Sequence, residues 1–327
     1  MNFEFAYIIL AHKNPKQLVR LLNRLNSSNF KVSFWIHIDK RSNFKDFHQA
    51  LKCFENIVWI PSQFTRWGSF QLVKVVLWAL FDIKNKSRSY RHVILLSGQD
   101  YPIINPDNIY SFLNENEKSS FIEYEPLPVK NLKFGGLDRF EKWHFYIGNR
   151  KLTFPLYNKN YGILDKIIQA ILCNFLPHKK ENLNNITLYY GSQWWILSFN
   201  CVEYILDFVN NNLRFVDFFK YSWISDEHFF QTILLNNNDE LFKYSCINNN
   251  LRYYDWTKPN ERPPAFLNQE DYNKIINSGK FFARKFDENI DNEILNQLDE
   301  YQKSNLTFKK GKVDLKESGI KINKFRL

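Results

Sequence analysis

The chain has 327 residues, which is enough for one large α/β domain or two smaller ones. Hydrophobic residues account for 44% of it and aromatic residues for 17%, a composition typical of a globular protein with a substantial core. Lys and Arg number 44 against 34 Asp and Glu, so the formal net charge of +10 favours polyanionic partners such as nucleic acid, anionic lipid or a nucleotide diphosphate.

The cysteines exclude a disulfide framework and a zinc site. Cys53, Cys173, Cys201 and Cys246 are widely spaced, and none of them belongs to a C-x-x-C pair. Cys173 and Cys201 lie in apolar runs, which predicts buried thiols and favours a reducing compartment. No segment approaches the roughly 20 apolar residues that span a bilayer, and the chain opens on a strand-like run instead of a signal peptide. We therefore expect a cytoplasmic protein.

The first half of the chain alternates apolar strand-like runs with segments of helical spacing. Strands are predicted at 5–11, 32–38, 58–60 and 92–96, and helices at 14–25, 70–83 and 106–113. Repeated βαβ units predict an α/β protein whose mostly parallel central sheet is flanked by helices. The carboxyl ends of its strands carry His12, Lys13, Asp39, Lys40 and Asp100. Because ligands bind at such ends, we expect a nucleotide pocket there.

The second half is less regular. Residues 126–160 are expected to form a long basic and aromatic loop, 188–197 a strand, and 202–212, 226–236 and 289–303 helices. We predict one domain over 1–303, divided into a nucleotide-binding half (1–120) and an acceptor and catalytic half (121–303), with a basic tail at 304–327.

One helical stripe in this half is strongly apolar. It consists of Leu164, Ile167, Ile168, Ile171, Leu172 and Phe175. A core-facing helix is the favoured interpretation, and a helix on a membrane surface is the alternative, given the positive charge of the chain.

Several familiar nucleotide-binding motifs are missing. The sequence contains no G-x-G-x-x-G and no Walker A motif, which excludes a dinucleotide fingerprint and a P-loop. It also contains no D-x-D, the pair of carboxylates that holds a divalent metal against the diphosphate in many nucleotide-sugar enzymes.

Six local motifs together resemble one family. They are TRWGS (65–69), ILLSGQDYPI (94–103), GSQWW (191–195), DEHFF (226–230), LRYYDW (251–256) and FFARKFD (281–287). In this order the chain resembles the core-2/I-branching β-1,6-N-acetylglucosaminyltransferases, a family that includes the peptide O-xylosyltransferases. The resemblance implies a GT-A-type nucleotide-sugar-binding fold, a UDP-sugar donor, inversion at the anomeric carbon and no metal or other cofactor.

The resemblance also assigns a catalytic base. Glu227 matches the family's general base, which deprotonates the acceptor hydroxyl as it attacks the sugar C1. Its neighbour Asp226 is interpreted as a helix cap or positioning group, because Ser225 can serve as the N-cap of a helix whose first turn carries both acids.

Basic and polar residues are expected to hold the donor. Lys285 matches the family's diphosphate-binding lysine, Arg262 falls where a companion cation is expected, and Arg284 is a possible substitute for it. His12 and Asp39 are expected at the uridine, with a purely structural histidine as the alternative for His12. Asp100 is expected near the donor sugar, or as an anchor of the turn in which it lies.

Other residues are expected to bind the acceptor. Glu123 matches an acidic sugar-binding position, and Trp256 matches an aromatic one whose face would stack on a pyranose. Trp195 and its neighbour Trp194 either contact the acceptor or belong to the core. Arg139 and Lys142 lie in the loop region where the family contacts its acceptor.

These features together predict a metal-independent, inverting glycosyltransferase that moves GlcNAc or xylose to a glycan hydroxyl in the synthesis of a surface polysaccharide or lipooligosaccharide. Animal members carry a membrane anchor and disulfides, so the chain resembles a bacterial cytosolic member, with work at the inner membrane face on a lipid-linked glycan as an option. A non-catalytic glycan- or nucleotide-binding protein on the same fold is the alternative. Nucleic-acid binding ranks last, because the chain contains no recognised module or concentrated basic stripe.

Overall fold

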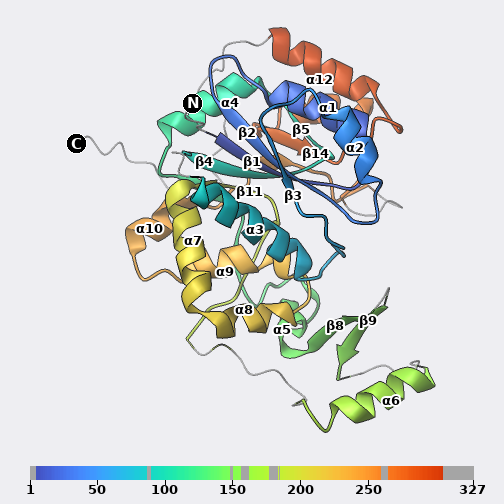
Figure 1. The fold of residues 1–327 in the computed structure, drawn as a ribbon. Coiled ribbons are helices and arrows are strands. Elements are labelled where there is room, and N and C mark those ends of the chain that lie inside the picture. Colours follow the sequence, from blue (N-terminus) through green and yellow to red (C-terminus); the bar gives the residue numbers. More distant parts are fainter. Residues whose placement is uncertain are drawn as a thin grey trace.

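The computed structural model describes residues 5–86, 90–147, 150–155, 162–176, 183, 185–258 and 264–304, and is built around a seven-stranded sheet (Figure 1). The strand order is β12-β6-β11-β4-β1-β2-β3. These strands are β1 (Phe5–Ala11), β2 (Val32–Ile38), β3 (Ile57–Ile60), β4 (His92–Ser97), β6 (Ser120–Ile122), β11 (Trp195–Ser198) and β12 (Cys246–Ile247). All of them run in one direction except β11, which is antiparallel to both of its neighbours.

Helices cover both faces of the sheet (Figure 1). The α-helices are α1 (Pro15–Leu25), α2 (Phe44–Ala50), α3 (Gln71–Asn85), α4 (Pro106–Glu115), α5 (Asp138–Glu141), α6 (Ile163–Leu172), α7 (Phe199–Asn211), α8 (Leu213–Lys220), α9 (Phe229–Leu235), α10 (Glu240–Ser245), α11 (Tyr272–Ile276) and α12 (Glu293–Ser304). Three 3₁₀ turns are η1 (Lys133–Gly136), η2 (Ser225–Glu227) and η3 (Gln269–Asp271).

Alternate residues of β1 supply two separate hydrophobic cores. Ile8 packs in the core beneath α3, α7 and α9, whereas Tyr7 and Ile9 pack in the core beneath α1, α4 and α12. This follows from the two-residue period of a strand, which sends neighbouring side chains to opposite faces. Burial of each such side chain contributes roughly 1.5–3 kcal/mol.

Smaller sheets complete the structure. β5 (Asp100–Pro102), β13 (Arg252–Tyr253) and β14 (Phe282–Arg284) form a three-stranded sheet with β14 in the middle. Its register pairs Arg284 with Asp100, so a residue near the C-terminus lies beside the end of β4. β7 (Glu125–Pro126) pairs with β10 (Tyr189–Tyr190), and β8 (Trp143–Ile147) forms a hairpin with β9 (Arg150–Phe154).

The predicted α/β class and the mostly parallel sheet flanked by helices are confirmed. The strands predicted at 5–11 and 32–38 have the observed bounds, because buried parallel strands are recognisable as continuous apolar runs.

Two predicted segments are wrong in detail. The loop predicted at 126–160 contains η1, α5 and the β8–β9 hairpin, in which aromatic residues on both faces of β8 conceal the alternation of a strand. The single strand predicted at 188–197 is two strands in different sheets. The break lies at Gly191, where an added Cβ would come within 1.8 Å of the Glu123 carbonyl oxygen.

The favoured core-facing interpretation of the 164–175 stripe is also wrong. Leu164, Ile167, Ile171 and Phe175 are 52–77% exposed, and Cys173 is exposed as well, whereas Cys201 is buried as predicted. Figure 1 shows α6 beside the β8–β9 hairpin, away from the sheet, so its apolar face has no core to cover it. Among the described helices, none is long and apolar enough to cross a membrane.

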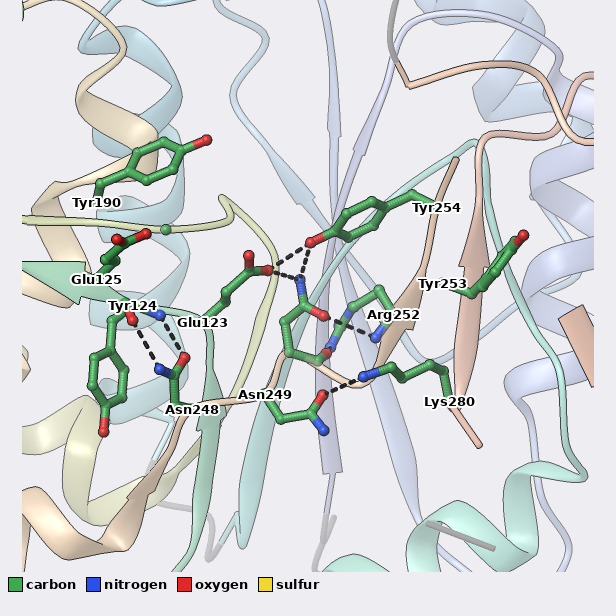
Figure 2. A pocket seen from close by; sticks show the side chains of 12 residues that line it. Glu123, Tyr124, Glu125, Tyr190, Asn248, Asn249, Arg252, Tyr253, Tyr254 and Lys280 are labelled. Atoms are coloured by element: carbon green, nitrogen blue, oxygen red, sulfur yellow. Dashed lines mark hydrogen bonds between the residues drawn. The ribbon is translucent and has the colours of Figure 1, made fainter. Parts of the chain in front are cut away.

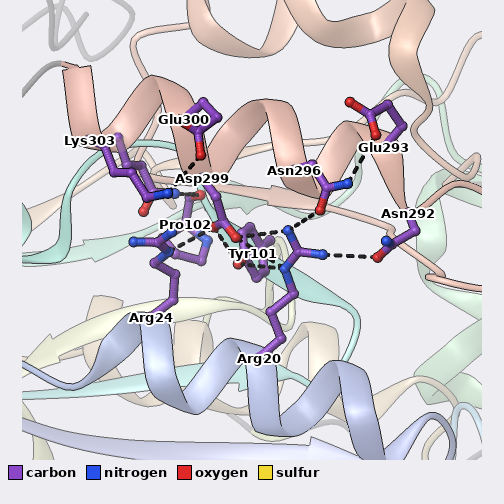
Figure 3. A network of polar contacts seen from close by, with 11 residues as sticks. Arg20, Arg24, Tyr101, Pro102, Asn292, Glu293, Asn296, Asp299, Glu300 and Lys303 are labelled. Carbon is purple, nitrogen blue, oxygen red and sulfur yellow. Dashed lines mark hydrogen bonds and ion pairs between the residues drawn. The ribbon is translucent and has the colours of Figure 1, made fainter.

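Helix α12 is attached to α1 by a charge network (Figure 3). Asp299 accepts from Arg20 at 2.8 Å, from Arg24 at 2.7 Å and from the Tyr101 hydroxyl at 2.7 Å. Arg20 also donates to Asn292 at 2.9 Å. The network spans α1, β5 and α12, and thereby fixes the chain that leads from β14 into α12.

We expect Asp299→Ala to lower the free energy of unfolding by about 3 kcal/mol, because it leaves two partly buried arginines without their shared partner. Burial tends to raise the pKa of Asp299, but the donors Arg24, Tyr101 and Arg20 outweigh it and hold the pKa below its ordinary value. The stabilisation is therefore present at neutral pH and is lost as the pH falls below about 4.

Urea unfolding of the variant and the wild type between pH 3 and 8 measures this difference. The control is Glu300→Ala, which removes an exposed ion pair with Lys303 and is expected to change the free energy by less than about 1 kcal/mol. Equal stability of Asp299→Ala and wild type at pH 7 would contradict the assigned role of the network.

Candidate active site

The strands that share one direction bring their polar carboxyl ends to one edge of the sheet. His12 follows β1, Asp39 follows β2, Glu123 follows β6 and Asn248 follows β12. The edge expected from the sequence therefore exists, and it extends across the full width of the sheet.

Glu227 is presented above this edge by a short 3₁₀ turn. Ile224 adopts a left-handed conformation with φ 56°, η2 follows, and His228 with φ −136° separates η2 from α9. The helix predicted to start at 226 therefore starts at Phe229. The N-cap prediction for Ser225 is wrong, because its hydroxyl donates to the carbonyls of Phe219 and Ser222 and caps no helix.

Two adjacent carboxyl groups occupy this turn. The Glu227 side chain is 23% exposed, and Asp226 is buried. Burial and the neighbouring Asp226 raise the pKa of Glu227 above its ordinary value, against the opposing effect of Arg139. Burial also raises the pKa of Asp226. A carboxylate with a raised pKa in a partly open site has the properties of a general base that works near neutral pH.

Arg139, at the start of the segment that leads into β8, lies beside this pair. Its Nη1 is 3.4 Å from Glu227 Oε2, and its guanidinium lies over the Tyr190 ring, 5.2 Å from the centroid. The predicted acceptor residue Arg139 therefore contacts the predicted base, and Lys142 lies on the other side of α5 near Phe134.

A cavity of about 630 Å³ opens next to Glu227 (Figure 2). Its lining is dominated by carboxylates, amides and tyrosines: Glu123, Tyr124, Glu125, Tyr190, Asn248, Asn249, Asn250, Tyr253 and Tyr254, with Gly191, Arg252 and Lys280. Glu123 accepts from the Tyr254 hydroxyl at 2.6 Å and from Asn250 at 2.9 Å. Gly191 donates its N–H to the Glu227 carbonyl at 2.9 Å, which joins the cavity wall to the base.

The predicted acceptor tryptophans have different environments. Trp256 is 56% exposed and packs edge-on against Tyr254, with ring centroids 5.5 Å apart. Trp195 is fully buried and packs against Phe230, so it has no face open to an acceptor and belongs to the core.

A group of cations lies at the other end of the edge. Lys285 and Lys13 both lie over the Phe266 ring, 4.5 and 5.0 Å from its centroid, and Lys13 is paired with Asp287. Burial and the neighbouring Arg284 lower the pKa of Lys285, and partial burial and Lys13 lower the pKa of His12. Arg262 lies outside the described residues.

Arg284 is almost fully buried beside this group. Its guanidinium lies over the Trp194 ring at 4.1 Å, and its Nε is 3.4 Å from Asp100. Neither its Nε nor its Nη1 forms a hydrogen bond with any residue that the structure describes. Asp100 is fully buried, accepts from the Ser97 N–H at 2.8 Å, and has a pKa raised by burial. Buried donors without partners are rare, and they commonly face a ligand.

Asp39 has a different set of partners from the one expected. Its carboxylate accepts from Arg41 Nε at 2.7 Å and Nη2 at 2.9 Å, and from the Thr65 hydroxyl at 2.6 Å. Both oxygens are therefore engaged by the protein, and Asp39 fixes Arg41 and the TRWGS segment at the sheet edge.

Sequence reasoning missed several residues of the site. Asn250 and Tyr254 hold Glu123, and Tyr190 lies between the cavity and Arg139. The polar run that follows the apolar strand β12 is a signal that could have identified Asn250. Within the described ranges, no group of three or more His, Cys, Asp or Glu side chains is placed to hold a metal ion.

Comparison with known proteins gives a consistent result. A family model described as "Branch: Core-2/I-Branching enzyme" matches residues 5–276. The chain is 25% identical to Xylosyltransferase 2 of Rattus norvegicus, over 90% of this chain and 33% of that protein. It is 24% identical to Beta-1,3-galactosyl-O-glycosyl-glycoprotein beta-1,6-N-acetylglucosaminyltransferase 4 of Danio rerio, over 91% of this chain and 69% of that protein. The chain thus spans about a third of the rat relative.

Solved structures resemble it more remotely. A 4-diphosphocytidyl-2C-methyl-D-erythritol synthase from Anaerococcus prevotii DSM 20548 is 12% identical, with a TM-score of 0.32 over 65% of this chain and 76% of that chain.

Proposed function

The chain belongs to the core-2/I-branching enzyme family, and on this premise we propose that it is a metal-independent, inverting glycosyltransferase. It transfers GlcNAc or xylose from a UDP-sugar to a hydroxyl of a glycan acceptor, two donors suggested by the names of its relatives. The observation that carries the proposal is the position of Glu227, a carboxylate with a raised pKa next to a cavity rich in sugar-binding groups.

In the proposed reaction, the acceptor hydroxyl attacks the anomeric carbon while Glu227 takes its proton. The bond from the anomeric carbon to the UDP oxygen breaks on the opposite face, which inverts the configuration. The proton ends on Glu227, and the negative charge ends on the β-phosphate of UDP. A positioned base of this kind typically contributes about 10²–10⁴ in rate.

Fixed cations are proposed to stabilise the departing UDP. Arg284 brings buried donors without partners among the described residues, and Lys285 brings an ammonium on the same short segment. Such charge-assisted hydrogen bonds are strongest where burial excludes water, and they act on charge that develops in the transition state. His12, Asp100 and the Arg41 held by Asp39 would complete the donor site.

The cavity is proposed to bind the acceptor. Glu123 is held by Tyr254 and Asn250 with its carboxylate toward the cavity (Figure 2), so it can accept from sugar hydroxyls. Trp256 offers an exposed ring that can stack on the apolar face of a pyranose.

The same proposal includes a cellular context. The protein would work in the cytoplasm on a surface polysaccharide or lipooligosaccharide precursor, with α6 in contact with anionic lipid at the inner membrane face. The exposed apolar residues of α6 and the net charge of +10 support this contact.

Incubation with a panel of UDP-sugars and glycan acceptors tests the enzyme proposal through UDP release. Release is expected with EDTA present, and Glu227→Gln is expected to lower it by about 10²–10⁴. Glu203→Gln, an exposed carboxylate on α7, is the matched control and should keep full activity. Release that requires Mn²⁺ would contradict the metal-free mechanism, and binding without turnover would favour the non-catalytic alternative.

The pH profile offers a second prediction. Because the pKa of Glu227 is raised, the rate should be low in acid and rise as the pH increases through that pKa. Asp226→Asn removes a negative charge that raises this pKa, so the rising limb of kcat/KM should move to lower pH. Asp207→Asn on α7 is the control, because its carboxylate is 65% exposed and pairs with Lys84. An unchanged limb in Asp226→Asn would show that the two carboxyl groups are not coupled.

Sedimentation with vesicles of anionic phospholipid tests the membrane contact. Wild-type protein should bind at low salt, and the double variant Ile167→Glu/Ile171→Glu should bind at least about tenfold more weakly, with activity on a soluble acceptor unchanged. The control Leu241→Glu/Tyr244→Glu makes the same charge change on exposed residues of α10. Failure of the wild type to sediment would refute the contact.

A further inference from the structure

His228 is fully buried between the proposed base and α9, and both of its ring nitrogens are engaged. Nδ1 lies 2.9 Å from the Tyr189 carbonyl oxygen, and Nε2 lies 2.9 Å from Arg139 Nη1. The ring packs edge-on against Phe140, with centroids 4.7 Å apart, and lies 5.4 Å from the Tyr190 ring. Its orientation is therefore fixed from several sides.

These partners determine the proton on the ring. A carbonyl oxygen only accepts, so Nδ1 must carry the hydrogen, and a guanidinium only donates, so Nε2 must offer its lone pair. Burial, and then the charge of Arg139, lower the pKa of His228 to about 3. The imidazole is accordingly neutral at physiological pH, and it accepts a hydrogen bond from a cation.

Arg139 receives support at each part of its side chain. Its carbonyl oxygen accepts from the Trp223 N–H at 2.9 Å, its guanidinium lies over the Tyr190 ring, and its Nη1 is shared between His228 Nε2 and Glu227 Oε2. Only 13% of the side chain is exposed. The His228 contact, at 2.9 Å, is shorter than the Glu227 contact, at 3.4 Å, so the imidazole is the closer partner of Nη1.

We propose that His228 is a positioning residue that acts through Arg139: its neutral Nε2 holds the guanidinium in place beside the Glu227 carboxylate. This inference rests on the proposed role of Glu227 as base. The held cation favours the ionised form of Glu227, against the charges of Asp226 in η2 and Glu123 at the end of β6. The phenol of Tyr190 from β10 faces the same space. Without the imidazole lone pair, Arg139 would lose its nearest partner and its fixed distance to the base.

Two amide substitutions separate this role from a merely structural one. Gln places its side-chain oxygen near the position of Nε2, so His228→Gln keeps an acceptor for Arg139 and loses the donor to Tyr189. Asn places its side-chain nitrogen near Nδ1, so His228→Asn keeps the donor to Tyr189 and loses the acceptor for Arg139. Thermal unfolding of both variants identifies any that fail to fold.

The readout is the titration of Glu227 and the pH profile of kcat/KM. We expect His228→Asn to raise the apparent pKa of Glu227 by roughly one unit and to lower kcat/KM at pH 7 about tenfold, whereas His228→Gln stays close to wild type. In Arg139→Met, the further change His228→Asn should add little, because both act on the same contact.

The titration can be followed without turnover, as the carboxyl ¹³C signal that disappears in Glu227→Gln. A protein that titrates as expected but releases no UDP would retain the His228 inference and refute the enzyme proposal. An unchanged Glu227 pKa in His228→Asn, or a larger change in His228→Gln than in His228→Asn, would overturn the inference.

Discussion

The shared direction of the strands in the central sheet is the constraint on which the site depends. Because β1, β2, β6 and β12 all run the same way, the residues that follow them gather at one edge. The buried apolar strands provide the free energy that holds this edge rigid, and loops can therefore carry polar groups without strand pairing of their own. The cation group and the cavity lie at two parts of one edge, a distance apart that the strand order sets.

Burial of charge is the second feature that unites the site. Asp226, Asp100 and Arg284 are almost fully buried, and each has at least one polar atom without a hydrogen-bond partner among the described residues. Such groups cost free energy in the absence of a ligand. Elsewhere the charges are well paired, as at Asp299 and Asp39. The poorly satisfied charges are thus concentrated where the proposed donor and acceptor would meet, as expected of a site that exchanges stability for function.

The sequence pattern predicted the sheet well and the connections poorly, for a physical reason. Strands such as β1 are buried on both faces and appear as apolar runs, whereas the break before α9 depends on contacts of His228 that arise only in the folded chain. The stripe on α6 has the period of a buried helix, yet nothing in that period says whether a core lies opposite it. Local motifs identified Glu227, but Asn250 and His228 belong to the site through contacts across the fold.

The strand order has a consequence for synthesis of the chain on the ribosome. β11 lies between β4 and β6, although about a hundred residues separate it from β4 in the sequence. The first four strands to emerge can pair as β4-β1-β2-β3, but β4 then presents an open edge until residue 198 has been translated. Open edges of apolar strands invite pairing with other chains. The nascent chain therefore passes through a long interval in which rapid elongation, or a chaperone that covers β4, favours the native sheet over aggregation.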